Sequence, residues 1–149
     1  MNQDYIFNIR ITGILIENNE ILLVQQKLSD KRNWSLPGGR LERGETLSQG
    51  LIREMKEETN LDVVHPQLCG VKQFPIENGR YVVFLFKSNE FSGELKSSDE
   101  GEMIWVNRNE LSNLSLVADF KELLDVMEND QYSEFQYVID NDEWIVHLK

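Results

Sequence analysis

The chain has few of the residues that build disulfide or zinc proteins. Its 149 residues contain one cysteine and two histidines. A single cysteine excludes an internal disulfide and suits a reducing compartment, so we expect a cytoplasmic protein. Cys69, His65 and His147 show no metal-ligand spacing, so a zinc site is not expected and these three are read as structural or surface residues.

The chain also lacks long apolar runs and an excess of basic residues. No stretch of about twenty apolar residues occurs, and the first residues lack the basic and apolar regions of a secretion signal. We therefore expect no membrane association and no leader. Lys and Arg total 15 against 26 Asp and Glu, for a net charge of −11. Long duplex nucleic acid is an unexpected partner, because it is bound by clustered Lys and Arg.

The length fits one domain, and we expect residues 1–149 to form it, because no repeat or linker interrupts the chain. Alternating and helical apolar patterns predict strands and helices in turn. The expected strands are Ile9–Ile16, Glu20–Gln26, Asp62–Phe74, Arg80–Lys87, Met103–Val106, Phe135–Ile139 and Trp144–Leu148. Helices are expected at Thr46–Thr59 and Val117–Asn129, with a helical turn at Asn109–Leu111 and a Gly38-Gly39 loop after Trp34–Pro37. Strands with helices on both sides predict an α/β/α sandwich around a mixed sheet.

Three acidic side chains are concentrated on the first of these helices. Glu54, Glu57 and Glu58 are separated by spacings that place side chains about 5–6 Å apart. Like charges at this distance repel, so a cation is expected among them. At about 100° per residue, Glu54 and Glu58 border the apolar stripe that includes Leu51 and Met55.

The alternative for this acidic cluster is a solvated helix face with ordinary ion pairs to Arg53 and Lys56. Its place at the edge of the apolar stripe argues against a purely solvated face. Gly50 lies one turn before Glu54 on the same side. A glycine inside a helix costs about 1 kcal/mol relative to alanine, so its presence indicates that bulk is unfavourable beside the acidic residues.

Gly39 to Leu61 resembles the box of the Nudix hydrolase family (MutT-type). That box reads Gly, five residues, Glu, seven residues, then Arg-Glu-apolar-any-Glu-Glu-any-Gly-apolar. Each specified position matches this sequence except that Asn60 replaces the last glycine. Asparagine is the next residue after glycine to adopt the left-handed conformation that ends helices, so the resemblance implies the Nudix fold.

The resemblance implies a role for each matching residue. It assigns divalent metal binding to Glu54, Glu57 and Glu58, and pairing with Glu45 to Arg53. It also makes the backbone of Gly39 a candidate metal ligand. Oxygen ligands favour Mg²⁺ or Mn²⁺ as the cofactor. The general base is expected to be Glu57 or Glu58, although family members also use a base outside the box.

Candidates outside the box are weaker. Glu100 and Glu102 precede a predicted strand, where family members place one more metal-binding or catalytic glutamate. We favour Glu100, because a glutamate in a loop can turn toward the metal; the alternative is an acidic surface loop. Arg40 is a candidate for phosphate binding. Trp34, Phe74 and Phe7 are candidates for stacking on a base, although such aromatic residues more often belong to the core.

Three functions remain open from the sequence. The first is hydrolysis of a nucleoside diphosphate linked to another moiety, with nucleoside triphosphates slightly favoured over ADP-ribose or nucleotide sugars. The second is hydrolysis at RNA 5′ ends, which a basic groove would favour. The third is a non-catalytic nucleotide sensor, and the presence of every box glutamate argues against it. The partner expected is a small nucleotide, and the protein is expected to be a monomer or homodimer.

Overall fold

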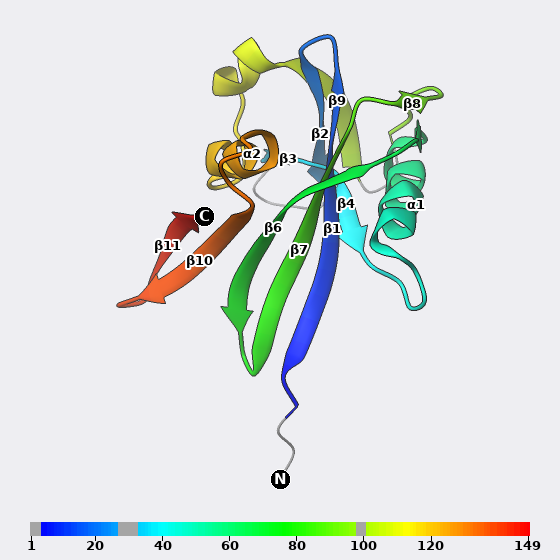
Figure 1. Cartoon of the computed structure of the whole chain (residues 1–149). Coiled ribbons are helices and arrows are strands. Elements are labelled where there is room, and N and C mark those ends of the chain that lie inside the picture. Colours follow the sequence, from blue (N-terminus) through cyan, green and yellow to red (C-terminus); the bar gives the residue numbers. More distant parts are fainter. Residues whose placement is uncertain (1–3, 27–32, 98–100) are drawn as a thin grey trace.

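A computed structural model describes residues 4–26, 33–97 and 101–149. Within these ranges the elements are eleven strands, two α-helices and one 3₁₀ helix (Figure 1). The strands are β1 (Ile6–Glu17), β2 (Glu20–Gln26), β3 (Trp34–Ser35), β4 (Gly38–Arg40), β5 (Asp62–Val63), β6 (Gln67–Ile76), β7 (Gly79–Ser88), β8 (Phe91–Ser92), β9 (Gly101–Asn107), β10 (Glu134–Asp140) and β11 (Glu143–Leu148). The helices are α1 (Leu47–Thr59), η1 (Arg108–Asn113) and α2 (Phe120–Glu128).

One mixed sheet forms the centre of the molecule. Its strand order is β11-β10-β6-β7-β1-β2-β3, with β4 paired to β1 and β9 paired to β2. The β1–β7 and β10–β6 pairs are parallel, and the other pairs of this sheet are antiparallel. Strand β1 is long enough to pair with β4 near Ile11 and with β2 near Ile16 along one edge.

The two helices cover opposite faces of this sheet. Side chains alternate between the faces along a strand, and Ile11 and Leu15 of β1 pack in a cluster with Leu51 and Met55 of α1. Ile14 of β1 instead joins the cluster that contains the buried residues of α2. Figure 1 shows α1 and α2 on either side of the strands. The predicted α/β/α sandwich with a mixed sheet is therefore confirmed.

Two hairpins of the sheet turn on consecutive residues with left-handed backbone angles. Asn18 and Asn19 have φ values of 51° and 65°, and Asn141 and Asp142 have 50° and 65°. Consecutive positive φ angles produce the tight turn whose twist matches antiparallel strands, and Asn and Asp tolerate them. In the described part of the chain, neither helix is long and apolar enough to span a membrane.

Two expectations around the central strands are wrong. The expected strand Asp62–Phe74 is divided into β5 and β6, because His65 has a positive φ of 50° and the following Pro66 has no N–H for a ladder. The segment around Gly38 and Gly39 was expected as a loop, but it forms strand β4 along β1.

Smaller differences concern the second half of the chain. Helix α2 begins at Phe120 rather than Val117, because Asp119 is left-handed with a φ of 60°. The expected turn at Asn109–Leu111 is the 3₁₀ helix η1. The short pair β5–β8 was missed, since a two-residue strand leaves no periodic pattern to detect.

Candidate active site

Both ends of α1 are fixed by local hydrogen bonds. At the N-terminus, the Thr46 hydroxyl accepts from the Gln49 N–H at 3.1 Å, and the Gln49 side chain accepts from the Thr46 N–H at 2.9 Å. At the C-terminus, Asn60 adopts the left-handed conformation with φ 68° and donates from its side chain to the Glu94 carbonyl at 2.9 Å. The prediction that asparagine replaces the usual glycine at this position is confirmed.

The buried face of α1 lies directly on β1. Leu51 and Met55 are fully buried, and a Cβ on Gly13 would lie 2.7 Å from Met55 Cε and 3.0 Å from Leu51 Cδ1. Glycine at this position therefore allows the helix to approach the sheet closely. This contact fixes the rotation of α1, which places the acidic side chains that follow beside strand β4.

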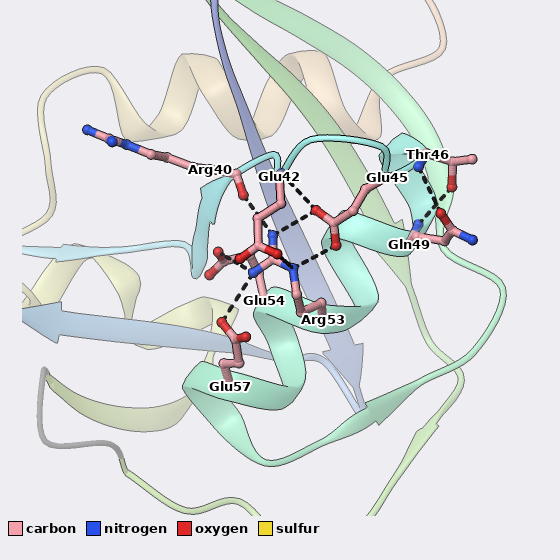
Figure 2. A network of polar contacts seen from close by, with 8 residues as sticks. All are labelled: Arg40, Glu42, Glu45, Thr46, Gln49, Arg53, Glu54 and Glu57. Carbon is pink, nitrogen blue, oxygen red and sulfur yellow. Dashed lines mark hydrogen bonds and ion pairs between the residues drawn. The ribbon is translucent and has the colours of Figure 1, made fainter.

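Arg53 is the centre of the polar network at this site (Figure 2). Its Nε and Nη2 donate to the two carboxylate oxygens of Glu45 at 2.6 and 2.9 Å. Its Nη1 donates to Glu54 at 2.9 Å and to Glu57 at 3.2 Å. Nη2 also donates to the carbonyl of Arg40 at 2.8 Å. One guanidinium therefore joins helix α1, strand β4 and the loop between them.

The electrostatics of this pair follow from its geometry. The hydrogen bonds from Arg53, together with the Glu42 N–H, hold the pKa of Glu45 below its ordinary value. The same hydrogen bond to Glu45 raises the pKa of Arg53, against a smaller opposing effect of burial. Both groups therefore stay charged through the neutral range. The expected Arg53–Glu45 pair is present, and it ties the loop to the helix.

Two glycines of β4 lie against the acidic residues of α1. A Cβ on Gly39 would lie 2.3–2.5 Å from the three carboxylate atoms of Glu54, so only glycine leaves room for that group. The N–H of Gly38 donates to Glu58 Oε2 at 2.9 Å. The Glu54 side chain is 14% exposed, whereas that of Glu57 is 58% exposed. Glu54 and Glu58 thus contact β4, whereas Glu57 contacts Arg53 in a more open position.

Gly50 has a different role from the one expected. A Cβ there would lie 2.8 Å from Leu41, 2.9 Å from Ile11 and 3.3 Å from Glu45 Oε1. The crowding comes mainly from apolar side chains rather than from the metal-binding candidates. Bulk is unfavourable at Gly50 because the β4–α1 loop folds over it.

The candidates for substrate binding, Arg40, Trp34 and Phe74, lie in different parts of the molecule. Arg40 gives its carbonyl to Arg53, while Figure 2 shows its own side chain extending away from the network. Trp34 is partly buried against the core on the α2 face. Phe74 stacks on Tyr81 at 4.6 Å. Trp34 and Phe74 are thus engaged with other hydrophobic side chains, away from the Arg53 network.

Glu100 and Glu102 are the two candidates for a further metal-binding or catalytic glutamate. Glu100 lies outside the described residues. Glu102 is exposed at the start of β9, where it pairs across the sheet with Gln25 of β2.

A hollow of about 650 Å³ opens beside the loop that carries Glu45. Its walls are residues 6–9 of β1, the segment from Arg40 to Glu45, and Ile76. Phe7 is 54% exposed in it, and Arg40 and Arg43 bring positive charge. Apolar and charged residues are mixed in its lining, which also includes Glu42 and Glu45.

Sequence reasoning missed several backbone contacts of the site. The N–H of Gly38, the carbonyl of Arg40 and the N–H of Glu42 each bind a side chain of the network. Their signal in the sequence is the short spacing between Gly39 and Glu45, which forces a tight loop. Residue identity carries no direct information about backbone groups, so only the structure reveals which of them are used.

The donor set fits a hard divalent cation. Glu54, Glu57 and Glu58 offer only carboxylate oxygens, which suit Mg²⁺ or Mn²⁺. Within the described ranges, no three acidic, histidine or cysteine side chains are already gathered in a ligating arrangement. Instead, Arg53 and the Gly38 N–H donate hydrogen bonds to oxygens of these carboxylates. Gly39 in turn allows the Glu54 carboxylate to lie directly against the backbone of β4.

The sequence is similar to a known protein family over most of its length. The model of the NUDIX domain family matches residues 8–127. The Nudix hydrolase YvcI of Bacillus subtilis is 33% identical over 125 residues, covering 79% of this chain and 78% of YvcI.

Two relatives with named activities match over shorter segments. An ADP-ribose pyrophosphatase of Methanocaldococcus jannaschii is 35% identical over 97 residues, or 63% of this chain and 57% of that protein. The human 8-oxo-dGDP phosphatase NUDT18 is 37% identical over 89 residues, or 59% of this chain and 27% of that protein.

Solved structures agree on the fold. A crystal structure of a MutT protein from Bacillus halodurans is 28% identical, with a TM-score of 0.77 over 95% of this chain and 97% of that one. A bifunctional NMN adenylyltransferase/ADP ribose pyrophosphatase from Francisella tularensis, crystallised with AMP and Mn, is 25% identical. Its TM-score is 0.65, covering 83% of this chain and 41% of that one. The chain therefore belongs to the NUDIX domain family and is a Nudix hydrolase.

Proposed function

We propose that this hydrolase cleaves a diphosphate bond in a nucleoside diphosphate linked to another moiety, with Mg²⁺ or Mn²⁺ as cofactor. The observation that carries the proposal is the contact of Glu54 and Glu58 with the two glycines of β4, with Glu57 joined to Glu54 through Arg53. A surface ion-pair network does not require a glycine that leaves only enough room for a carboxylate. A cation site, by contrast, needs ligand carboxylates in fixed positions, and Gly39 admits the Glu54 carboxylate at one such position.

In this proposal each residue has a separate task. Glu54, Glu57 and Glu58 hold the cation, with the Gly39 backbone beside them. When bound, a divalent cation neutralises phosphate oxygens and lowers the pKa of water. Arg53 orients Glu54 while its bond to Glu45 keeps the loop in place, because ligand carboxylates need fixed rotamers. Arg40, which lines the adjoining hollow, binds a substrate phosphate.

The general base is Glu57 or Glu58, and the structure supports each for a different reason. Glu57 is more than half exposed, so substrate water reaches it directly. Glu58 receives the Gly38 N–H at 2.9 Å, which fixes its position. Either carboxylate would accept the proton that the attacking water loses as its oxygen bonds to phosphorus, while the bridging oxygen leaves with the departing phosphate.

The named activities of two relatives support a nucleotide substrate. Those with named activities are an ADP-ribose pyrophosphatase and an 8-oxo-dGDP phosphatase, and both substrates contain a nucleoside diphosphate. The hollow is lined by Phe7 and two arginines, which offer an aromatic ring and positive charge, together with Glu42 and Glu45. We infer that the nucleoside lies there, so Phe7, rather than Trp34 or Phe74, contacts the base.

A substrate panel tests this function directly. Product release would be measured with Mg²⁺ or Mn²⁺ for nucleoside triphosphates, oxidised guanine nucleotides, ADP-ribose, nucleotide sugars and 5′-triphosphorylated RNA. We expect metal-dependent cleavage of one class of small nucleotide. Cleavage of RNA ends alone would overturn the small-molecule assignment. Nucleotide binding without cleavage of any member would favour the sensor alternative.

Gly39→Ala should lower activity about 10–100-fold with little loss of stability. The added methyl group displaces the Glu54 carboxylate, which is the flexible end of a side chain, so the fold accommodates it while the ligand moves. Gly70→Ala is the matched control, because its Cβ would lie 2.8 Å from Val126 and 3.2 Å from the Ser133 carbonyl. It should lower the melting temperature and leave the activity of the folded enzyme unchanged. Equal activity of Gly39→Ala and wild type would contradict the role of Glu54.

The cellular setting remains part of the proposal. The single cysteine favours a reducing environment, so we propose a cytoplasmic enzyme acting on a free nucleotide. Burial raises the pKa of the Cys69 thiol to about 11. Such a thiol remains protonated at neutral pH, which fits a structural residue rather than a reactive one.

A further inference from the structure

The C-terminal hairpin ends the sheet with an open strand. Strand β11 is the last in the order β11-β10-β6, and Figure 1 shows it at the outer edge of the molecule. Both strands of the hairpin lie beyond residue 127, where the family match ends. Proteins protect edge strands with proline, bulges or inward-pointing charges. The six residues of β11 contain no proline, and the pairing with β10 is continuous.

The hydrogen bonds of β10 determine which backbone groups of β11 face outward. Lys149 and Glu134 exchange both of their backbone hydrogen bonds, at 2.9 and 3.0 Å. In an antiparallel pair, hydrogen-bonded residues recur at every second position. His147, Ile145 and Glu143 therefore bond toward β10 as well. The N–H and C=O groups of Trp144, Val146 and Leu148 point away from β10, and among the described residues no further strand pairs with them.

The sequence of β11 is complementary to itself when two copies run antiparallel. If Val146 lies opposite Val146 of a second copy, Trp144 lies opposite Leu148, and each outward-facing residue pairs with an outward-facing residue. In the same register Glu143 lies opposite Lys149. That pair is not hydrogen-bonded through the backbone, so its side chains approach closely, at Cα distances of about 4.5 Å. Opposite charges directly across a pair of strands are stabilising.

The surroundings of this edge also favour a second copy. Trp144 and Ile145 are 50% and 39% exposed, and they lie on opposite faces of the strand. Asp140 pairs with Glu143 in the hairpin, and Asp142 occupies the turn between them. These three acidic side chains lie together at one end of β11. Lys149 of a second copy would bring a positive charge to that end, twice in a symmetric pair.

We propose that two copies of this chain associate through antiparallel pairing of β11, which joins their sheets across a two-fold axis at Val146. The shared surface is a pair of strands with four partly exposed apolar side chains from each copy, which is smaller than the roughly 1,600 Å² of a standard interface. The dimer is accordingly weak and concentration-dependent. This association goes beyond the proposed hydrolysis and does not depend on it.

Analytical ultracentrifugation over a wide range of protein concentration tests the proposal. The wild-type mass should rise toward that of a dimer. Lys149→Glu places like charges opposite each other in both copies and should weaken the dimer about tenfold. Glu143→Lys should do the same. The double variant Glu143→Lys, Lys149→Glu restores opposite charges and should return the dissociation constant to near the wild-type value.

Val146→Pro gives an independent check, because it removes an outward N–H without removing a bond to β10. It should be monomeric at every concentration, with its fold verified by circular dichroism. A wild-type protein that stays monomeric throughout would overturn the proposal. If the protein is a dimer but neither the charge variants nor Val146→Pro weakens it, the interface lies elsewhere. That result would also overturn the proposal. Nucleotide hydrolysis can succeed or fail in either case, so the two proposals are tested separately.

Discussion

Glu57→Gln should lower the rate of diphosphate cleavage at least about 100-fold while the protein stays folded. Changes to residues that merely orient a metal ligand cost about 10–100-fold, so loss of a ligand charge should cost more. The substitution keeps the shape of the side chain and removes one negative charge. Glu57 is 58% exposed and its contact with Arg53 is 3.2 Å, so the free energy of unfolding should change by less than about 1 kcal/mol.

The matched control is Glu110→Gln, an exposed glutamate of η1 whose side chain bonds Asn113. It should match wild type in both rate and melting temperature. Turnover would be measured with the preferred substrate from the panel, and Mn²⁺ binding would be measured by calorimetry. The expected result is weaker binding of Mn²⁺ to Glu57→Gln. Near-normal turnover with unchanged Mn²⁺ affinity would remove Glu57 from the metal site.

Arg53→Ala should lower both activity and stability. The substitution removes the bidentate bond to Glu45 and the bonds to Glu54, Glu57 and the Arg40 carbonyl. It also leaves the Glu45 and Glu54 carboxylates, 16% and 14% exposed, without their partner. Their repulsion loosens the β4–α1 loop and lets Glu54 leave its place beside Gly39. We expect an activity loss of about 100-fold and a melting temperature several degrees lower.

Two variants separate these effects. Arg53→Lys keeps the charge but loses the planar fork that binds two carboxylate oxygens, so it should recover stability better than activity. Arg108→Ala removes another arginine–carboxylate pair, with Glu128, whose side chains are similarly sheltered at 28% and 29% exposure. It should lower the stability of the protein and leave its activity unchanged. Equal activity losses in Arg53→Ala and Arg108→Ala would show that Arg53 acts through global stability rather than through ligand geometry.

The sequence predicts the helix of the site well because the signals there are local. The spacing of Glu54 and Glu58 relative to Leu51 and Met55 fixes their side of the helix before any tertiary contact forms. Asn60 predicts its own left-handed conformation, because few other residues tolerate it. These features depend on neighbours within a few turns, and the structure agrees with each of them.

The sequence predicts the surroundings of the helix less well, because they depend on distant partners. Strand β4 exists through its pairing with Arg10, Ile11 and Thr12 of β1, and two glycines give no strand signal of their own. The break at His65 needs a positive φ that histidine adopts only in this context. Phe74 and Trp34 illustrate the same limit, since an aromatic residue suits a core as well as a ligand.

The parallel pairing of β1 and β7 affects the order in which the enzyme assembles. Residues Gly38 to Glu58 meet within one short segment, so this part of the site is able to form early. Strand β1, which supports it, needs β7 on its other side, and their register joins Ile6 with Gly79. Contacts so distant in sequence form slowly. During synthesis, the ribosome must therefore release the chain through β7 before the strand beneath the carboxylates is paired on both sides.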